Sequence, residues 1–326
     1  MSQDPLYIGV DLGRSTRIAL VDSYGKIVSN NRFPTELSSG RGLVNSLIEV
    51  IKQTRQTTTA EISAIGIGFP GLVDHRTQKV EVLPNLADVS NVDIHQELCS
   101  AIDLPVILDN DANTAAYGEW KCGAAKGTSD VVFITIGTGI GGGIILGGYL
   151  QRGVCGFAGE FGHLKVGDLN MDCSCGSSGC LETVSSGPNI VRRTRERLFT
   201  DPAFTDSKLA PKMRGRLRCE DVMEAAILGD YLARSVLSET AIYLGTAISN
   251  LINLLNVEKV VLGGPVMKAA EYFISKVKEE TSRKCFAQLF DACEIVAAKL
   301  GDDAGVIGSA MMAQDSLFNN SLAAKP

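Results

Sequence analysis

The sequence predicts an α/β protein in which short strands and helices alternate along 326 residues. Two observations support this fold class. Short β-rich segments are followed by segments with helical spacing throughout the chain, which is the order typical of α/β layers. A strand–turn–strand unit at residues 7–22 also recurs at 131–146. The recurrence predicts two similar sheets facing each other across a cleft, although two short hairpins can also resemble each other by chance.

In the first half of the chain, "YIGVDLG" at 7–13 and "RIALVD" at 17–22 are β-rich and are separated by a turn of small residues. "ISAIGIGFPG" at 62–71 is predicted to be a buried strand, because it is almost wholly apolar and ends in a Pro-Gly turn. The other elements predicted in this half are a helix at 42–54, a strand at 104–111 and a helix at 112–123.

The second half begins with another pair of strands broken by glycines, "VVFITIGTGIGGGIILGG" at 131–148. Residues 230–256 have helical spacing with little charge in their second half, so this predicted helix belongs to the core. The elements predicted after it are a strand at 258–264, a helix at 271–284, a strand at 293–300 and a closing helix at 303–318.

The composition is that of a globular protein, with 45% hydrophobic and 21% charged residues. A net charge of −6 disfavours a nucleic-acid surface, and we interpret the basic segment at 212–218 as a solvated loop. No apolar run reaches the length of a membrane helix, about 18 residues, and the N-terminus does not resemble a secretory signal. Nine cysteines therefore indicate a reducing cytoplasm, where clustered cysteines more often bind metal than form disulfides.

The segment "GTGIGG" matches the dinucleotide fingerprint G-x-G-x-x-G at Gly137, Gly139 and Gly142. That fingerprint has to open a helix, whereas "GIILGG" here is short, β-branched and stopped by further glycines. We therefore predict a hairpin and not an NAD site. Such a hairpin can still hold phosphate, because backbone N–H groups without nearby Cβ atoms form a nest of donors, to which Thr138 adds a hydroxyl.

Three cysteines, Cys173, Cys175 and Cys180, follow the spacing C-x-C-x₄-C, and His163 precedes them by ten residues. Three thiolates and one imidazole form a closed tetrahedral set that suits Zn²⁺, so we predict a structural zinc site. A cysteine-rich loop without metal is the alternative.

Two glutamates bracket this cluster, Glu160 and Glu182. A loop fixed by metal would present these carboxylates at defined positions, which suits the hydroxyls of a polyol or sugar. The sequence therefore predicts a sugar-binding role for the region around the cysteines.

The segments "GEFGH" and "CSCGSSGCLE" together resemble the signatures of the ROK family of sugar kinases and sugar-responsive repressors. "IGVDLG", "GIGFPGLVD", "LDNDANTAAYGEW", "ITIGTGIGGGII", "VVLGG" and "LGDDAGVIGSA" follow in the family's order along nearly the whole chain. The resemblance implies a two-domain actin-like ATPase (ribonuclease H-like) fold with a duplicated mixed sheet and an interdomain cleft. The implied domains are residues 1–118 plus 302–326, and residues 119–301 with the zinc loop.

The resemblance also implies roles for residues on the sugar side. Asp111 in "NDAN" matches the general base, which accepts the proton of the sugar hydroxyl as its oxygen attacks the γ-phosphate. Spacing alone would favour a helix N-cap for the same residue. The positions that match sugar-contacting residues of the family are Gly71, Asn85, Asn110, Asp111, Glu160, His163 and Glu182.

On the donor side, Asp11 matches the carboxylate that holds Mg²⁺. The remaining implied positions are Gly13, Arg14, Ser15 and Thr16 in the first phosphate loop, Gly137, Thr138 and Gly139 in the second, and Gly263 and Gly264 at the nucleoside. The first loop departs from the family's D-x-G-G-T-K, with Arg14 in place of glycine and Thr16 in place of lysine. Either Arg14 or Arg17 replaces the missing positive charge, or the loop binds phosphate weakly. Pro265, where a third glycine is common, removes one N–H donor.

The predicted function is ATP-dependent phosphorylation of a hexose at its 6-hydroxyl, glucokinase-like, with structural Zn²⁺ and with Mg²⁺ accompanying ATP. Repressor members of the family carry an added N-terminal DNA-binding domain, and here the first predicted strand begins within a few residues, so we expect a kinase. The alternatives are a kinase for another hexose or an N-acetylated amino sugar, a polyphosphate-dependent kinase, and a sugar-binding sensor without catalysis. We expect a cytoplasmic protein without nucleic-acid or membrane partners, and a homodimer or higher homo-oligomer from the family alone.

Overall fold

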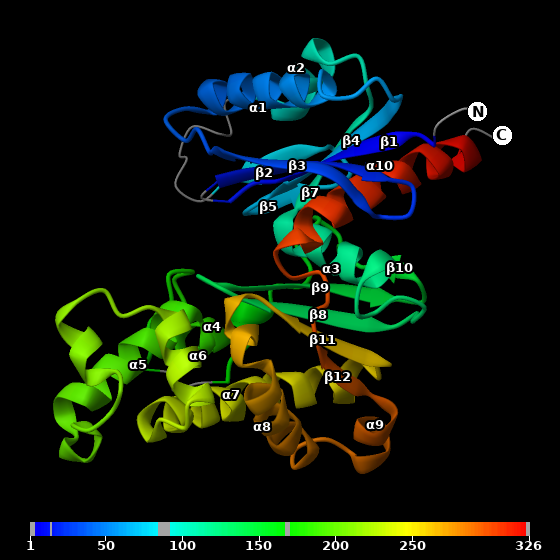
Figure 1. Cartoon of the computed structure of the whole chain (residues 1–326). Coiled ribbons are helices and arrows are strands. Elements are labelled where there is room, and N and C mark those ends of the chain that lie inside the picture. Colours follow the sequence, from blue (N-terminus) through cyan, green and yellow to red (C-terminus); the bar gives the residue numbers. More distant parts are fainter. Residues whose placement is uncertain (1–3, 14, 84–91, 167–169, 324–326) are drawn as a thin grey trace.

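The computed structural model describes residues 4–13, 15–83, 92–166 and 170–323. It has two lobes, each built around a five-stranded sheet, with helices between and outside the sheets (Figure 1). The first sheet has the order β3-β2-β1-β4-β7. Its strands are β1 (Leu6–Asp11), β2 (Ser15–Asp22), β3 (Ile27–Pro34), β4 (Ile62–Phe69) and β7 (Val106–Asn110).

The second sheet repeats this arrangement with the order β10-β9-β8-β11-β12. In both sheets the first two strand pairs are antiparallel and the last two are parallel, so the duplication predicted from the hairpins at 7–22 and 131–146 is confirmed. The strands of the second sheet are β8 (Val131–Ile136), β9 (Ile140–Leu146), β10 (Tyr149–Leu150), β11 (Lys259–Gly263) and β12 (Glu294–Ala297). A separate hairpin consists of β5 (Leu72–Asp74) and β6 (Lys79–Val82).

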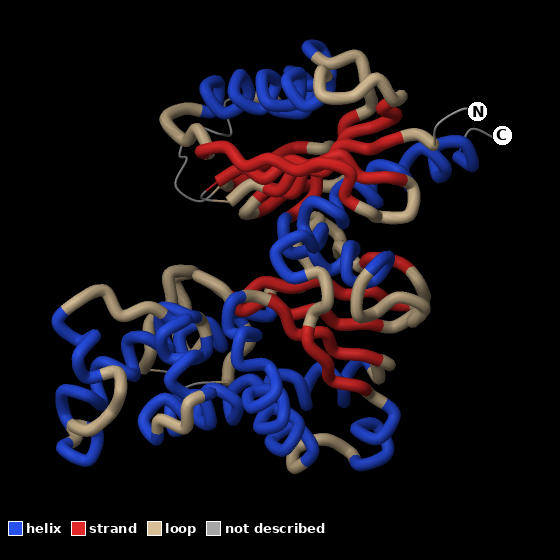
Figure 2. The backbone as a smooth tube through the Cα atoms, viewed as in Figure 1, coloured by secondary structure: helices blue, strands red, loops and turns tan. Residues whose placement is uncertain are grey.

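Helices cover both faces of the sheets (Figure 2). α1 (Gly40–Arg55) and α2 (Ile94–Ala101) lie on the outer face of the first sheet, whereas α3 (Asp111–Cys122) and α10 (Ala304–Ala323) lie on the face toward the second lobe. The helices of the second lobe are α4 (Leu181–Ser185), α5 (Gly187–Thr200), α6 (Cys219–Ile227), α7 (Tyr231–Leu255), α8 (Ala270–Ser282) and α9 (Ala287–Ala292). The predicted domain limit at 118–119 falls inside α3, and the two-domain division stays a prediction.

The alternation of side chains along β1 explains the two layers of the first lobe. Ile8 and Val10 belong to the core under α1 and α2, and Tyr7 belongs to the core under α10. α10 approaches the sheet unusually closely, because a Cβ on Gly9 would overlap the carbonyl oxygen of Val306. A Cβ on Gly308 would likewise overlap the carbonyl oxygen of Thr114, so α10 also fixes α3. These contacts therefore fix the position of the end of β1, at Asp11, relative to the end of β7, at Asn110.

Candidate active site

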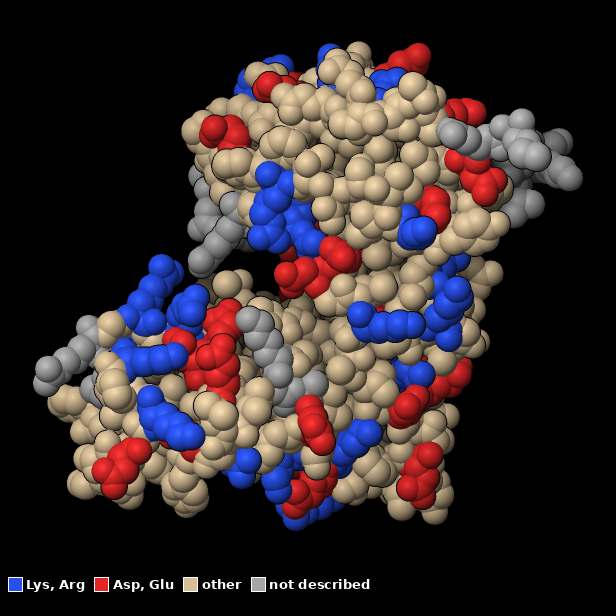
Figure 3. All heavy atoms as spheres, viewed as in Figure 1, with Lys and Arg blue, Asp and Glu red and all other residues tan. Residues whose placement is uncertain are grey.

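A cleft of about 520 Å³ lies between the two lobes, within the usual size of small-molecule sites, roughly 300–1,000 Å³. The space-filling view shows the molecule hollowed between its lobes (Figure 3). The structure brings together around this cleft all of the predicted sugar-side residues that it describes: Gly71, Asn110, Asp111, Glu160, His163 and Glu182. Asn85 lies outside the described residues.

Asp111 is placed by the turn from β7 into α3. Asn110 is the N-cap of α3, since its Oδ1 accepts hydrogen bonds from the N–H groups of Ala112 (2.9 Å) and Asn113 (3.1 Å). The Nδ2 of Asn110 donates to the carbonyl of Gly71 at 2.9 Å, which fixes the turn further. The capping role that spacing alone favoured for Asp111 is thus filled by its neighbour, and the Asp111 carboxylate lines the cleft.

The electrostatic surroundings of Asp111 suit a proton acceptor. Burial raises its pKa to about 7, and the carboxylates of Asp11 and Glu160 act in the same direction. A base is most effective when its pKa lies near the working pH. An aspartate at the mouth of a water-exposed turn would be far weaker as a base, so the cleft itself makes this residue suitable.

His163 has its two ring nitrogens directed at different groups. Its Nδ1 lies 3.8 Å from the Sγ of Cys173, and its Nε2 lies 3.8 Å from the Oε2 of Glu160. Burial raises the pKa of Glu160, with His163 opposing the shift and Glu182 adding to it. One side of the imidazole therefore faces the thiols, and the other faces the acidic end of the cleft.

The four predicted metal ligands converge. The ligand atoms of His163, Cys173, Cys175 and Cys180 all lie within 4.8 Å of one another. Cys175 Sγ and Cys180 Sγ are 3.8 Å apart. Zn–S bonds of about 2.3 Å at a tetrahedral angle place two sulfurs roughly 3.8 Å apart, so the donor set and its spacing fit zinc. Two glycines of positive φ make the turn, Gly176 (+85°) and Gly179 (+69°).

Glu182 has a contact that the sequence did not predict. Its Oε2 accepts a hydrogen bond from the N–H of Ile140 at 2.8 Å, in the hairpin that carries the second glycine loop. A Cβ on Gly139 would lie 2.5 Å from the same oxygen, so only glycine lets the loop approach so closely. Because Glu182 follows Cys180 by two residues, it connects the cysteine loop to the predicted phosphate loop.

The second glycine loop is a hairpin turn between β8 and β9, as predicted, and it does not open a helix. The N–H of Gly137 donates to the carbonyl of Gly139, and Thr138 at the tip is exposed. The end of β11 lies beside it: Gly264 has a φ of +92°, and a Cβ there would overlap the carbonyl oxygen of Ile136. Two of the predicted donor segments are therefore adjacent.

Asp11 lies at the end of β1 against the first turn of α10, where a Cβ on Gly305 would come within 2.7 Å of its Cγ. Burial raises the pKa of Asp11, and Arg17 opposes that shift. A carboxylate oxygen in this position is a hard ligand of the kind Mg²⁺ prefers, so Asp11 fits the predicted metal role. Its charge also acts on Asp111, which places the two predicted functional aspartates near each other.

Comparison with known proteins gives the family directly. A family model described as the ROK family matches residues 7–316. The chain belongs to the ROK family. The predictions of the family and of the fold class are confirmed.

Several ROK proteins are similar over almost the whole chain. A glucokinase of Halalkalibacterium halodurans is 37% identical over 311 residues, which cover 94% of each protein. The crystal structure of a ROK family glucokinase from Streptomyces griseus, in complex with glucose and AMPPNP, has a TM-score of 0.81 and 32% identity, over 95% of this chain and 99% of that one. A ROK family transcriptional regulator, a homologue of the E. coli MLC protein, has a TM-score of 0.90 and 27% identity over 99% of this chain and 81% of its own.

The first phosphate loop of this ROK protein is the part least suited to its predicted role. Thr16 is buried, and its Oγ1 lies 3.0 Å from the Oγ1 of Thr35, so it faces the core. Gly13 is exposed and Ser15 half-buried at the hairpin tip, and Arg14 lies outside the described residues. Arg17 forms an ion pair with Asp303 at 2.5 Å. The structure thus places Asp11 close enough to Asp111 for their charges to interact, but turns the Thr16 side chain into the core.

A cross-lobe ion pair lies directly behind the site of this ROK protein. Asp109, the residue before the Asn110 cap, is 3% exposed and accepts hydrogen bonds from Arg152 Nε (2.6 Å), Asn113 Nδ2 (3.0 Å) and the N–H of Asn110 (2.8 Å). Arg152 precedes the loop that ends at Glu160. The pair therefore ties the second-lobe loop with Glu160 to the first-lobe turn with Asp111. This contact was not predicted from the sequence, because nothing in the spacing of two residues 43 positions apart indicates that they meet.

Arg152→Met is expected to destabilise the protein, because it leaves the buried Asp109 carboxylate without its cation. We expect the free energy of unfolding, measured by urea denaturation, to fall by about 3 kcal/mol. The double variant Asp109→Asn with Arg152→Met removes both charges and should regain part of this loss. A double variant no more stable than Arg152→Met alone would mean that the ion pair does not hold the two loops together.

Proposed function

We propose that this chain is an ATP-dependent hexose kinase, glucokinase-like, which transfers the γ-phosphoryl group of ATP to the 6-hydroxyl of glucose. The observation that carries the proposal is the half-buried Asp111 carboxylate, which lines one cleft together with Glu160, His163 and Glu182. The named glucokinases among the relatives support the same class of enzyme.

In the proposed reaction, Gly71, Asn85, Asn110, Glu160, His163 and Glu182 bind and orient the sugar. Asp111 accepts the proton of the 6-hydroxyl while that oxygen forms a bond to the γ-phosphorus and the bond from phosphorus to the β-phosphate oxygen breaks. ADP leaves with the electron pair of the broken bond. Closure of the lobes would exclude water, so that ATP is not hydrolysed.

On the donor side, we propose that Gly13, Arg14, Ser15, Gly137, Thr138 and Gly139 form the phosphate loops, and that Gly263 and Gly264 contact the nucleoside. The side chain of Thr16 faces the core and takes no part in binding phosphate. Asp11 would hold Mg²⁺, which when bound neutralises charge on the transferred phosphate. His163, Cys173, Cys175 and Cys180 would hold a structural Zn²⁺. None of the helices in the described part of the chain has the length and apolar character needed to cross a bilayer. We place the protein in the cytoplasm on the proposed reaction, and a homo-oligomer stays a prediction.

A sugar sensor without catalysis is the second candidate, and two observations favour it. Thr16 stands buried where the family pattern has lysine, and the overall shape is very similar to that of a transcriptional regulator. Asp111 in the cleft and the intact hairpin at 137–139 favour the kinase.

An assay of ADP release with MgATP across a panel of hexoses tests the proposal. We expect turnover that depends on glucose, and 6-deoxyglucose should bind as a competitive inhibitor without being phosphorylated. Fructose, mannose and N-acetylated amino sugars test the other acceptors, and inorganic polyphosphate tests the other donor. Sugar binding by calorimetry without turnover, with any acceptor or donor, would overturn the kinase in favour of the sensor.

A further inference from the structure

Asp11, Arg17 and Arg32 form a row of side chains across three neighbouring strands of the first sheet. In the register of the first sheet, Asp11 on β1 is paired with Arg17 on β2, and Arg17 is paired with Arg32 on β3. Residues that are paired across antiparallel strands point to the same face of a sheet. All three therefore lie on the face occupied by α10, which is the face toward the second lobe.

The two guanidinium groups are only partly neutralised by the protein. Arg17, 17% exposed, donates from Nη2 to Asp303 Oδ1 at 2.5 Å. Arg32 is exposed, and among the described residues it has no ion pair. Like charges directly opposite on adjacent strands destabilise a sheet, so this arrangement favours a bound anion. A groove of about 400 Å³ is lined by Arg17, Asn30, Arg32 and Val306, among others.

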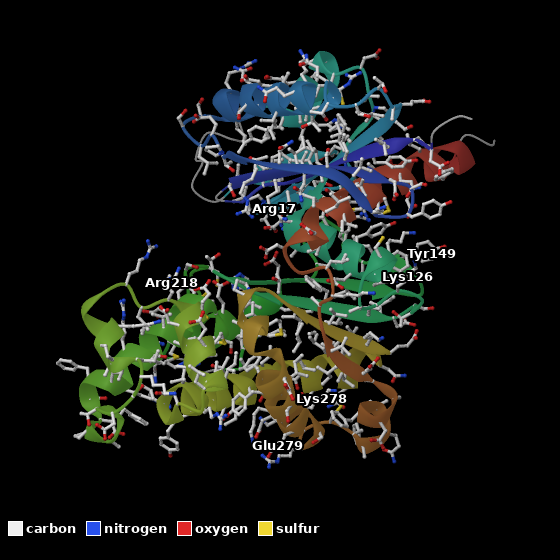
Figure 4. The ribbon with its side chains drawn as sticks, in the orientation of Figure 1. Arg17, Lys126, Tyr149, Arg218, Lys278 and Glu279 are labelled. Atoms are coloured by element: carbon white, nitrogen blue, oxygen red, sulfur yellow. The ribbon has the colours of Figure 1, made fainter. Side chains whose placement is uncertain are left out.

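The row is close enough to Asp11 to act at the same ligand. Neighbouring strands lie about 4.8 Å apart, which puts the α-carbon of Arg32 about 10 Å from that of Asp11, within the combined reach of an arginine and a phosphate chain. Arg17 lies at the lower edge of the upper lobe, above the opening between the lobes (Figure 4).

The alternation of side chains along β2 explains why Arg17, and not Thr16, lies on the same face of the sheet as Asp11. Thr16, at the position of the family's lysine, points into the core, and Arg17 as the next residue points to the opposite face, where Asp11 lies. We propose that Arg17 and Arg32 bind the terminal phosphates of the phosphoryl donor and replace the lysine of the first phosphate loop. Guanidinium groups suit this role, because their planar fork matches two phosphate oxygens. The inference rests on the proposed kinase function and names its donor-side residues.

Arg32→Gln tests the proposal with little risk to the fold, since the side chain is exposed on an edge strand. We expect the KM for MgATP to rise five- to twentyfold, while the KM for glucose stays within twofold. Arg195→Gln, an exposed arginine on α5, is the matched control and should change neither constant. Arg17→Lys should also raise the donor KM, because lysine keeps the charge but loses the fork. An unchanged donor KM in Arg32→Gln with normal glucose turnover overturns the proposal.

Direct binding separates failure of this proposal from failure of the kinase function. Calorimetry with magnesium and inorganic tripolyphosphate, and separately with MgADP, measures the anion site without turnover. Weaker binding of both probes to Arg32→Gln supports the site, whether or not any hexose is phosphorylated. Weaker binding of tripolyphosphate alone supports it and places the contact at the terminal phosphate, which ADP lacks. Equal binding of both probes to the parent protein and Arg32→Gln overturns it.

Discussion

Asp111→Asn is expected to lower kcat for glucose phosphorylation by 10²- to 10⁴-fold, the usual contribution of a general base. The glucose dissociation constant should change only a few-fold, because asparagine keeps the shape and one acceptor oxygen of the side chain. The α3 cap does not depend on Asp111, since Asn110 provides it, so the variant should fold normally. Asp103→Asn, an exposed residue of the same lobe, is the matched control and should retain full turnover. A kcat within tenfold of the parent value in Asp111→Asn would contradict the assignment of the base.

The same carboxylate should give the enzyme its pH dependence. Burial raises the pKa of Asp111 to about 7, and the base must be deprotonated to accept a proton. In the free enzyme, kcat/KM for glucose is therefore expected to fall about tenfold per pH unit below 7 and to level off above it. Bound Mg²⁺ near Asp11 would shift this inflection to lower pH. A profile that stays flat between pH 5.5 and 8 would contradict the assigned role.

The pH dependence of protein stability provides a second test of the raised pKa of Asp111, independent of the kinetics. Because its pKa is raised on folding from about 3.8 to about 7, the contribution of Asp111 to stability is fully present below about pH 4 and is lost as the pH rises through 7. Asp111→Asn cannot ionise and escapes this loss. We therefore expect its Tm to exceed that of the parent by more at pH 8 than at pH 5. This readout does not depend on catalysis.

The parts of the site that the sequence predicted are those carried by short segments. His163 and the three cysteines lie within 18 residues of one another, so their spacing already restricts the metal geometry. The glycine loop was predictable as a hairpin, because the β-branched residues that follow it exclude a helix. The duplicated sheet followed from two hairpins that share one pattern. The edge strand β3, with four polar or charged residues and one proline among its eight residues, has a weaker strand signal and was not predicted.

Contacts between distant segments could not be predicted in the same way. Glu182 bonds to Ile140 within the second lobe, and Arg152 bonds to Asp109 across the two lobes. Both contacts join segments that are far apart in the sequence, and no local pattern encodes either one. The roles of Asn110 and Asp111 were also ambiguous, since either residue can cap a helix and only the backbone geometry shows which one does. The pairing of Arg17 with Arg32 depends on the register of β2 and β3, which the sequence leaves open.

Cys175→Ser is expected to release zinc and, with it, the affinity for sugar. The thiolate is one of four converging ligands, and His163 and Glu160 are held beside the sulfurs, so loss of metal should free the residues that bind the sugar. Elemental analysis should find close to one zinc per chain in the parent protein and far less in the variant. The glucose dissociation constant, measured by calorimetry, should rise at least tenfold.

The effect should also be specific to the sugar side. Cys175 is exposed, so serine there does not disturb the core, unlike a change at the buried Cys180. Cys99→Ser, at another exposed cysteine on α2, is the matched control and should keep both zinc and glucose affinity. Glu182 lies in α4, after the last metal ligand, and its hydrogen bond to the N–H of Ile140 does not involve the metal. We therefore expect the KM for MgATP to change less than the KM for glucose. Zinc-free protein with undiminished glucose affinity would show that the cysteine loop holds its carboxylates without metal.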